Sequence, residues 1–242
     1  MPRGHRPGVH DPVSSGLDRF LHGLSPPDRD RALDVLRACP TIEIDAGPRF
    51  ATVFSPGALL LVEEGFVVLR ATVPGVLRAV VTCEAGAGKL VLPPLPEEVL
   101  LGLGTSRVLV LDAEARSRLL RIPALADRIV EQLAGALGQK QEATSNFAPT
   151  RHIERVRRKL LQLGRSYGHV ARDGIRIDFP VSHALLAQMI GSSRETVTRA
   201  VDELQRGGFV ARNGSTYRLL VPPESVVQPV RSYLGFARKS SV

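Results

Sequence analysis

The spacing of apolar residues divides the chain into a helical start, a middle of short strands and a helical second half. Residues 14–39 carry apolar side chains at helical spacing, interrupted by Pro26 and Pro27. From residue 41 to residue 112, short segments rich in Val and Leu alternate with Gly and Pro, as strands and tight turns do. The strands predicted there are residues 50–54, 58–62, 66–71, 77–83, 89–92 and 107–111. This texture predicts a β-sandwich, a barrel or a jelly roll.

A long helix is predicted after the strands. Asp112 can cap a short helix through residue 121, and Pro123 opens a longer helix that reaches about residue 143. Apolar residues recur along it at alternating intervals of four and three, the rhythm of a helix that packs against another helix: Ile122, Ala126, Ile129, Leu133 and Ala136. We predict that these residues form the seam of a two-helix dimer. So short a repeat leaves a second interpretation open, in which the helix packs on its own β domain.

Residues 182–210 have the pattern of a helix-turn-helix. Ser182 can cap a first helix over residues 183–190, Gly191 supplies the turn, and a second helix runs from Ser192 or Ser193 to about Arg206. The apolar positions fall where two short crossing helices must touch: Leu186, Ala187, Ile190, Val197, Val201 and Leu204. The outer face of the second helix is polar, as a face presented to a DNA major groove must be: Arg194, Glu195, Thr198, Arg199 and Asp202.

The segments on either side of this motif are basic or hairpin-forming. Residues 152–166 predict a helix with apolar residues inward and basic residues outward, and residues 174–179 predict a short strand. Residues 209–212 and 215–220 flank Asn213-Gly214, a two-residue hairpin signal. The hairpin predicts a wing beside the helix-turn-helix.

The positive charge of the chain is concentrated in the half that carries this motif. Residues 1–149 have 16 Lys and Arg against 17 Asp and Glu, whereas residues 150–242 have 16 against 7. The whole formal net charge of +8 therefore comes from the second part of the chain. A nucleic acid is the expected partner of that part, and no basic amphipathic helix with bulky apolar anchors suggests a membrane.

Other classes of protein are disfavoured. The sequence has no signal peptide and no apolar run of about 18 residues, so we expect a cytoplasmic protein. Cys39 and Cys83 lie far apart and outside any Cys-x-x-Cys, so we expect two buried thiols and no metal site. Residues 86–89 read Gly-Ala-Gly-Lys, but Leu90 stands where a phosphate-binding loop needs Ser or Thr. Because Cys, His and acidic residues are not grouped, we expect no catalytic residues and no enzyme.

Together these features resemble the cyclic-AMP receptor protein and fumarate-nitrate regulator (Crp/Fnr) family of bacterial transcription factors. The resemblance is specific over residues 153–220, where residues 191–199, GSSRETVTR, stand in the family's recognition segment. Over residues 41–112 only the strand texture is similar. The resemblance implies an α+β fold with an N-terminal β-roll, a jelly roll like that of cyclic-nucleotide-binding domains, then a long dimerisation helix and a C-terminal winged helix-turn-helix.

The expected domain order follows from this resemblance. It consists of a flexible arm (1–13), a sensor β-roll domain with flanking helices (14–121), a dimerisation helix (122–145), a hinge (146–150), a winged helix-turn-helix DNA-binding domain (151–222) and a C-terminal tail (223–242). The expected partners are a palindromic operator in double-stranded DNA, a second copy of the chain and RNA polymerase.

Particular residues of the second helix are candidates for reading DNA. The resemblance implies that Arg194, Glu195 and Arg199 contact base edges. Arg can bond to O6 and N7 of guanine, and Glu can accept from the exocyclic amine of cytosine. The candidate phosphate contacts are Ser182, Ser193, Thr196, Thr198, Arg212 and Arg218. A competing interpretation of Glu195 is that it closes a capping box with Ser192 and reads no base.

The sensor half departs from the family pattern. Cyclic-nucleotide binders have a Gly-Glu pair and then an Arg-Ser or Arg-Thr pair that cradle the phosphate. Residues 86–111 have no Gly-Glu pair, their only Arg is Arg107, and Glu97 and Glu98 would repel a phosphate. The resemblance therefore does not extend to cyclic AMP bound in the usual way.

Several sensor chemistries stay open, and no cofactor is evident. Haem would need a ligand from His5, His10 or His22, with Cys39 or Cys83 opposite, and either cysteine could be a thiol switch. An unidentified small-molecule effector, such as a different nucleotide, is another candidate. We expect a homodimeric transcription regulator that such an effector switches. The alternative is a nucleoid-like or effector-independent DNA-binding protein that uses its sensor domain only for dimerisation.

Overall fold

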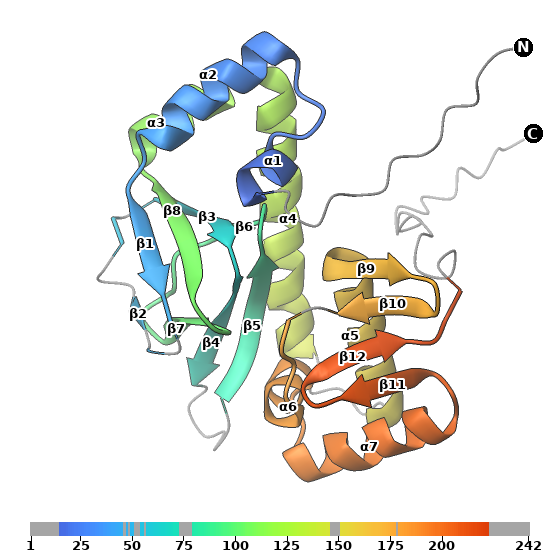
Figure 1. Cartoon of the computed structure of the whole chain (residues 1–242). Helices are drawn as coiled ribbons and strands as arrows, with labels where there is room; N and C mark the ends of the chain where they lie inside the picture. Colours follow the sequence, from blue (N-terminus) through green and yellow to red (C-terminus); the bar gives the residue numbers. More distant parts are fainter. Residues whose placement is uncertain are drawn as a thin grey trace, which may run out of the picture. The chain divides into compact units, whose positions relative to one another are not determined.

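The computed structural model describes residues 15–222, apart from residues 46, 48, 51–53, 56, 73–78, 146–150 and 178. The chain divides into two compact units, and the main boundary falls between Pro149 and Thr150 (Figure 1). The predicted arm, hinge and tail, with His5 and His10, lie outside the described residues.

The first unit combines strands with four helices. Its elements are α1 (Gly16–Phe20), α2 (Pro26–Arg37), β1 (Thr41–Ile44), β2 (Arg49–Phe50), β3 (Leu59–Glu64), β4 (Phe66–Thr72), β5 (Ala79–Gly86), β6 (Leu90–Val91), β7 (Glu98–Gly102), β8 (Ser106–Leu111), α3 (Ala113–Leu120) and α4 (Pro123–Ser145). The strands form two antiparallel four-stranded sheets, in the orders β1-β8-β3-β6 and β2-β7-β4-β5. This arrangement confirms the predicted β-roll.

Alternation along the strands builds two hydrophobic cores. In β3, Leu60 and Val62 face the second sheet, and Val67 and Leu69 of β4 join them in the core between the sheets. Leu59 and Leu61 face the opposite way and pack with the helices. The sequence did not predict β1 or β7, because β1 carries exposed residues and β7 begins at the acidic Glu98 beside a Pro-rich segment.

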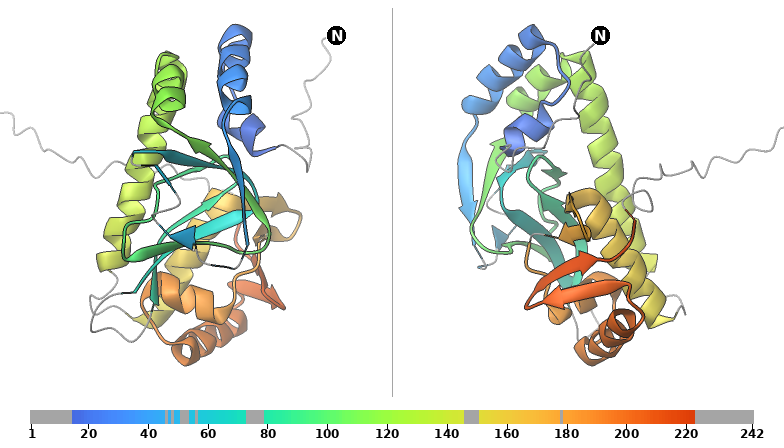
Figure 2. Two further views of the ribbon diagram at one scale, coloured as in Figure 1. Left: turned by 90° about the vertical axis from the view of Figure 1, so that its left-hand side faces the viewer. Right: turned by 45° about the vertical axis from the view of Figure 1, so that its right-hand side comes forward.

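Helix α4 packs along β5 and β6 of its own unit (Figure 2). Ile122 and Ile129 are 3 % and 2 % exposed in the core under the helices, and Leu133 packs against that core. Ala136 is 4 % exposed in the core between the sheets, and Ala126 is half-buried. The prediction of a dimer seam is wrong for Ile122, Ile129 and Ala136, because the cores of their own unit already cover these side chains.

The second unit combines a small sheet with helices, of which α5 and α7 contact the strands. Its elements are α5 (His152–Tyr167), β9 (Gly168–Ala171), β10 (Gly174–Ile177), α6 (His183–Ile190), α7 (Arg194–Arg206), β11 (Val210–Asn213) and β12 (Thr216–Leu219). The strands form an antiparallel sheet in the order β11-β12-β10-β9. Strand β9 is not predicted, since His169 and Val170 are both exposed and leave no apolar alternation. No helix among the described residues is long and apolar enough to cross a bilayer.

Candidate nucleic-acid interface

Local bonds and one glycine shape the turn between α6 and α7. Ser182 Oγ accepts a hydrogen bond from Leu185 N–H at 3.1 Å and caps α6. Gly191 has a φ of 61°, a left-handed conformation that a side chain disfavours. Ser193 caps α7, because its Oγ accepts from Thr196 N–H at 3.1 Å. These signals are local in sequence, which explains why both helices begin where the sequence predicts.

One side of α7 anchors the helix in the unit. Val197 and Val201 have no exposed surface, and Leu204 is 6 % exposed. Burying three such side chains stabilises the helix position by several kcal/mol, about 1.5 to 3 kcal/mol each. The opposite side of α7 is consequently left to solvent.

The three predicted base-contacting residues lie on this solvent side. Arg194, Glu195 and Arg199 are all exposed, and they occupy the first half of α7. Side chains in the first half of a recognition helix are the ones that reach base edges in a major groove. The structure therefore brings the predicted readers together on one face.

Glu195 is not the acidic member of a capping box. A capping box would need the N-cap three residues earlier, at Ser192. The N-cap is instead Ser193, while Ser192 is 7 % exposed and its N–H donates to Ala187 O at 2.9 Å. Glu195 is thus the second residue of the helix, where an acid is favourable to the helix dipole, and the capping-box interpretation is wrong.

The hydroxyl groups near this face have partners within the protein. Ser193 Oγ and Thr196 Oγ1 are 2.8 Å apart and share a hydrogen bond. Thr198 Oγ1 donates to Arg194 O at 2.9 Å and lies 2.8 Å from His183 Nδ1 of α6. Ser193 and Thr196 would have to share their bonds with a phosphate, whereas Thr198 already links the two helices.

His183 adds a titratable group to the junction of α6 and α7. Burial, followed by the positive charge of Arg212, lowers the pKa of His183 below its usual value. Arg194 acts in the same direction, and Asp202 opposes it. Burial and the neighbouring arginines therefore favour the neutral form of the ring.

The wing, strands β11 and β12, carries a basic pocket of about 330 Å³. Arg212 and Arg218 line it, together with Arg176 of β10. The Arg218 guanidinium donates to the Asp173 carboxylate, and the Arg212 guanidinium lies 5.9 Å from the centre of the Tyr217 ring. Arg176 is not among the residues predicted from the sequence, although its outward position in the predicted strand 174–179 was a usable signal.

Tyr217 supports the wing from inside. It is 1 % exposed, and burial raises the pKa of its phenol to about 12. A second contact joins the basic helix to the wing region: the Arg157 guanidinium of α5 lies 5.0 Å from the centre of the Phe209 ring. The aromatic residues thus hold arginines at the surface of the second unit.

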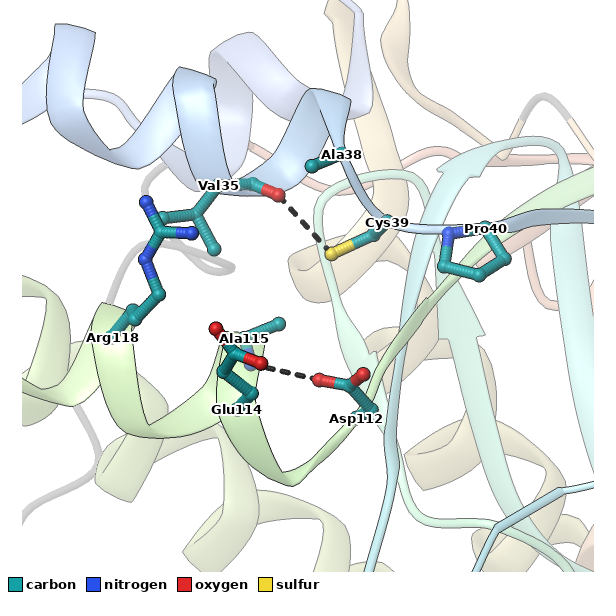
Figure 3. A pocket seen from close by; sticks show the side chains of 8 residues that line it. All are labelled: Val35, Ala38, Cys39, Pro40, Asp112, Glu114, Ala115 and Arg118. Carbon is teal, nitrogen blue, oxygen red and sulfur yellow. Dashed lines mark hydrogen bonds between the residues drawn. The ribbon is translucent and has the colours of Figure 1, made fainter.

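The first unit has a small pocket of about 160 Å³ between the end of α2 and the start of α3 (Figure 3). Cys39 lines it and donates from Sγ to Val35 O at 3.3 Å. Burial, followed by the nearby charge of Asp112, raises the pKa of the Cys39 thiol. The other cysteine, Cys83, is 2 % exposed. Because the thiolate is the reactive form, this setting disfavours a thiol switch at Cys39.

Arg107 and Glu98, two charged residues of the first unit, are paired within the protein. Arg107 donates to Glu63 at 2.8 Å and to Glu64 at 3.3 Å. Glu98 is 3 % exposed and forms an ion pair with Lys140 of α4 at 2.8 Å. Among the described residues, no group of three or more His, Cys, Asp or Glu is placed to hold a metal ion.

Comparison with known proteins finds one matching domain model and several similar folds. Residues 154–224 match the model of the Crp-like helix-turn-helix domain. The fold is similar to that of a CooA mutant from Carboxydothermus hydrogenoformans, with a TM-score of 0.62 and 16 % identity over 80 % of this chain and 88 % of that one. Residues 154–224 are therefore similar to Crp-like helix-turn-helix domains. The fold is also similar to that of the c-di-GMP responsive global regulator CLP from Xanthomonas campestris, with a TM-score of 0.56 and 22 % identity over 82 % of this chain and 100 % of that one.

Curated relatives match only part of the chain. The global nitrogen regulator of Synechocystis sp. is 48 % identical over 52 residues, which are 22 % of this chain and 23 % of the relative. The CRP-like cAMP-activated global transcriptional regulator of Mycobacterium tuberculosis is 26 % identical over 111 residues, or 46 % of this chain and 50 % of the relative. The chain therefore spans half or less of the length of these relatives.

Proposed function

We propose that this chain is a Crp/Fnr-type, sequence-specific transcription regulator that binds a palindromic operator as a homodimer. The observation that carries the proposal is the exposed face of α7, where Arg194, Glu195 and Arg199 lie together on a helix whose other side is fully packed. Two such helices in a symmetric dimer would enter successive major grooves about 34 Å apart.

Each residue of this face has a chemical role in the proposal. Arg194 and Arg199 bond to guanine through O6 and N7, and Glu195 accepts from the amine of a cytosine. Ser182 and Ser193 lie at the N-termini of α6 and α7, where backbone N–H groups favour a phosphate, and Thr196 and Thr198 flank that site. Arg176, Arg212 and Arg218 of the wing region supply further positive charge for the backbone.

The face of α4 that the β-roll leaves uncovered is the proposed dimer contact. Val130 is 62 % exposed and Leu137 is 54 % exposed, and Ala134 lies between them at the same alternation of four and three. The exposed Gly138 lets a second backbone approach closely. A second copy of α4 is the natural occupant, because a helix-turn-helix protein that reads two half-sites needs a two-fold partner. RNA polymerase stays a predicted partner.

Arg199→Ala tests the reading face. The variant is expected to lose about 1 to 3 kcal/mol of operator binding and to relax selectivity at one position of each half-site. Arg206→Ala is the matched control, because it removes the same charge from the exposed far end of α7. Binding is measured at one salt concentration on operators varied base by base. Selectivity that is unchanged at every position in Arg199→Ala would refute the assignment.

A nucleoid-like DNA-binding protein is the competing function, since it would use the same basic unit and the same dimer. Genome-wide footprinting separates the two. A regulator occupies a limited set of promoters with a shared palindrome, whereas a nucleoid-like protein binds with little preference. Uniform occupancy would favour the competing function.

A further inference from the structure

Helix α4 is fastened to the β-roll by polar side chains as well as by its apolar face. Gln132 Oε1 accepts from Leu90 N–H at 2.7 Å, and its Nε2 donates to Gly88 O at 3.2 Å. Gln139 binds both backbone groups of Glu84 in the same way, at 2.8 and 3.3 Å. Since β5 is the edge strand of its sheet, Gln139 supplies a partner that a neighbouring strand would otherwise provide.

A buried carboxylate lies beside these contacts. Glu98, at the start of β7, receives Lys140 Nζ on both oxygens, at 2.9 and 2.8 Å. Thr82 Oγ1 of β5 donates to Oε1 at 2.6 Å, and Leu95 N–H donates to Oε2 at 3.0 Å. A cation, a hydroxyl group and a backbone N–H from three segments therefore converge on one anion.

The carboxylate is charged in this setting. Burial by itself would raise the pKa of Glu98, but the hydrogen bonds from Lys140, Thr82 and Leu95 outweigh it, and the pKa lies below its ordinary value. The same three donors would suit a carboxylate or a phosphate that arrived from solution. The chain fills the position with a side chain of its own.

We propose that Lys140, Thr82 and the Leu95 N–H form an anion-binding site whose permanent ligand is Glu98, so that α4 is seated on the β-roll without a bound effector. Gln132 and Gln139 are two helical turns apart, so their bonds hold the helix in one rotational setting about its axis. The face with Val130 and Leu137 is then left uncovered.

The consequence concerns regulation and rests on the proposed function. If α4 presents its dimer face without a bound effector, operator binding needs no added small molecule. Removing the internal anion takes away one of the fastenings of α4, while the Gln132 and Gln139 bonds remain. The helix is then held less firmly, and the spacing of the two reading helices of the dimer is less sharply defined. Glu98 would then act as a positioning residue for DNA binding, although it belongs to the other unit of the chain.

Chemical rescue tests the anion site itself. Glu98→Ala opens room for a small carboxylate, and full-length protein is heated in sodium acetate or in sodium chloride at equal ionic strength. The variant is expected to melt below wild type in chloride and to regain stability saturably with acetate. Wild type and the double variant Glu98→Ala, Lys140→Met should show no such gain. An equal effect of acetate on all three proteins, or none on Glu98→Ala, would overturn the site.

Operator binding tests the consequence. Dialysed wild type is expected to bind its operator without additives, and Glu98→Gln, which keeps the shape of the side chain, is expected to bind about 5- to 150-fold more weakly while staying folded. Equal affinity of the two folded proteins would overturn the regulatory inference. The site selectivity of wild type and of Arg199→Ala is measured in the same assay. If wild type shows no site selectivity, the proposed function fails. The acetate titration of Glu98→Ala still decides the anion site in that case.

Discussion

Replacing Val130 and Leu137 together with alanine removes most of the apolar surface that α4 leaves exposed. Both side chains lie on the outer face of the helix, at 62 % and 54 % exposure, and they make no part of either buried core. Alanine keeps the helix, because it has the highest helix propensity. The double variant is therefore expected to fold normally and to dissociate into monomers.

The size of the effect follows from the surface that remains to be buried. Truncation removes about two carbons from Val130 and about three from Leu137, each worth about 0.8 kcal/mol when fully buried. Because roughly half of each side chain is exposed, the loss is about 1 kcal/mol per residue. Each residue occurs twice in a symmetric dimer, so the total is about 4 kcal/mol, or about a thousandfold in the dissociation constant.

Sedimentation velocity over a range of protein concentrations measures this constant. Ile129→Ala is the matched control, because Ile129 is 2 % exposed in the core beneath α4. That change is expected to lower the free energy of unfolding by about 2 to 5 kcal/mol and to leave the dimer of folded protein intact. The reasoning is refuted if the double variant stays dimeric over the same concentrations, or if Ile129→Ala is the variant that dissociates.

Three further predictions concern stability. Ser193→Ala removes the cap of α7 and should lower the free energy of unfolding by about 1 kcal/mol in urea titrations, whereas a larger loss would indicate another role for Ser193. The pKa of Tyr217 is raised to about 12, so the contribution of the neutral phenol to the free energy of unfolding is complete below about pH 10 and is lost as the pH rises through 12. In Tyr217→Phe, the fall of the free energy of unfolding at alkaline pH should be smaller. The pKa of Glu98 is lowered, so the contribution of its carboxylate to the free energy of unfolding is present above about pH 4 and is lost in acid. In Glu98→Gln, this loss of stability in acid should be absent. The same dependence of the free energy of unfolding on pH in variant and wild type would contradict the ion pair.

The second unit is the part that sequence reasoning described best. Helix α6 runs from His183 to Ile190 as predicted, and α7 begins after Ser193, one of the two caps expected. The hairpin turn follows Asn213, within the predicted wing. These features depend on capping residues, a turn glycine and short apolar repeats, all of which act over a few residues.

The first unit was predicted in outline and missed in detail. Strand β7 begins at Glu98, a residue that the sequence suggested would repel a ligand phosphate. Its actual partner, Lys140, is 42 positions away in the chain. No local pattern reports a contact of that length, so neither the strand nor the role of its acid could be derived beforehand.

The amino-acid sequence by itself determined that α4 is a long amphipathic helix and that α7 presents Arg194, Glu195 and Arg199 on one side. It could not decide which side of α4 a partner would meet, because Ile129, Leu133 and Ala136 repeat with the same intervals as Val130, Ala134 and Leu137. Only the tertiary structure distinguishes the two stripes. The β-roll covers the first stripe with its own apolar side chains, and the second is left exposed for another molecule.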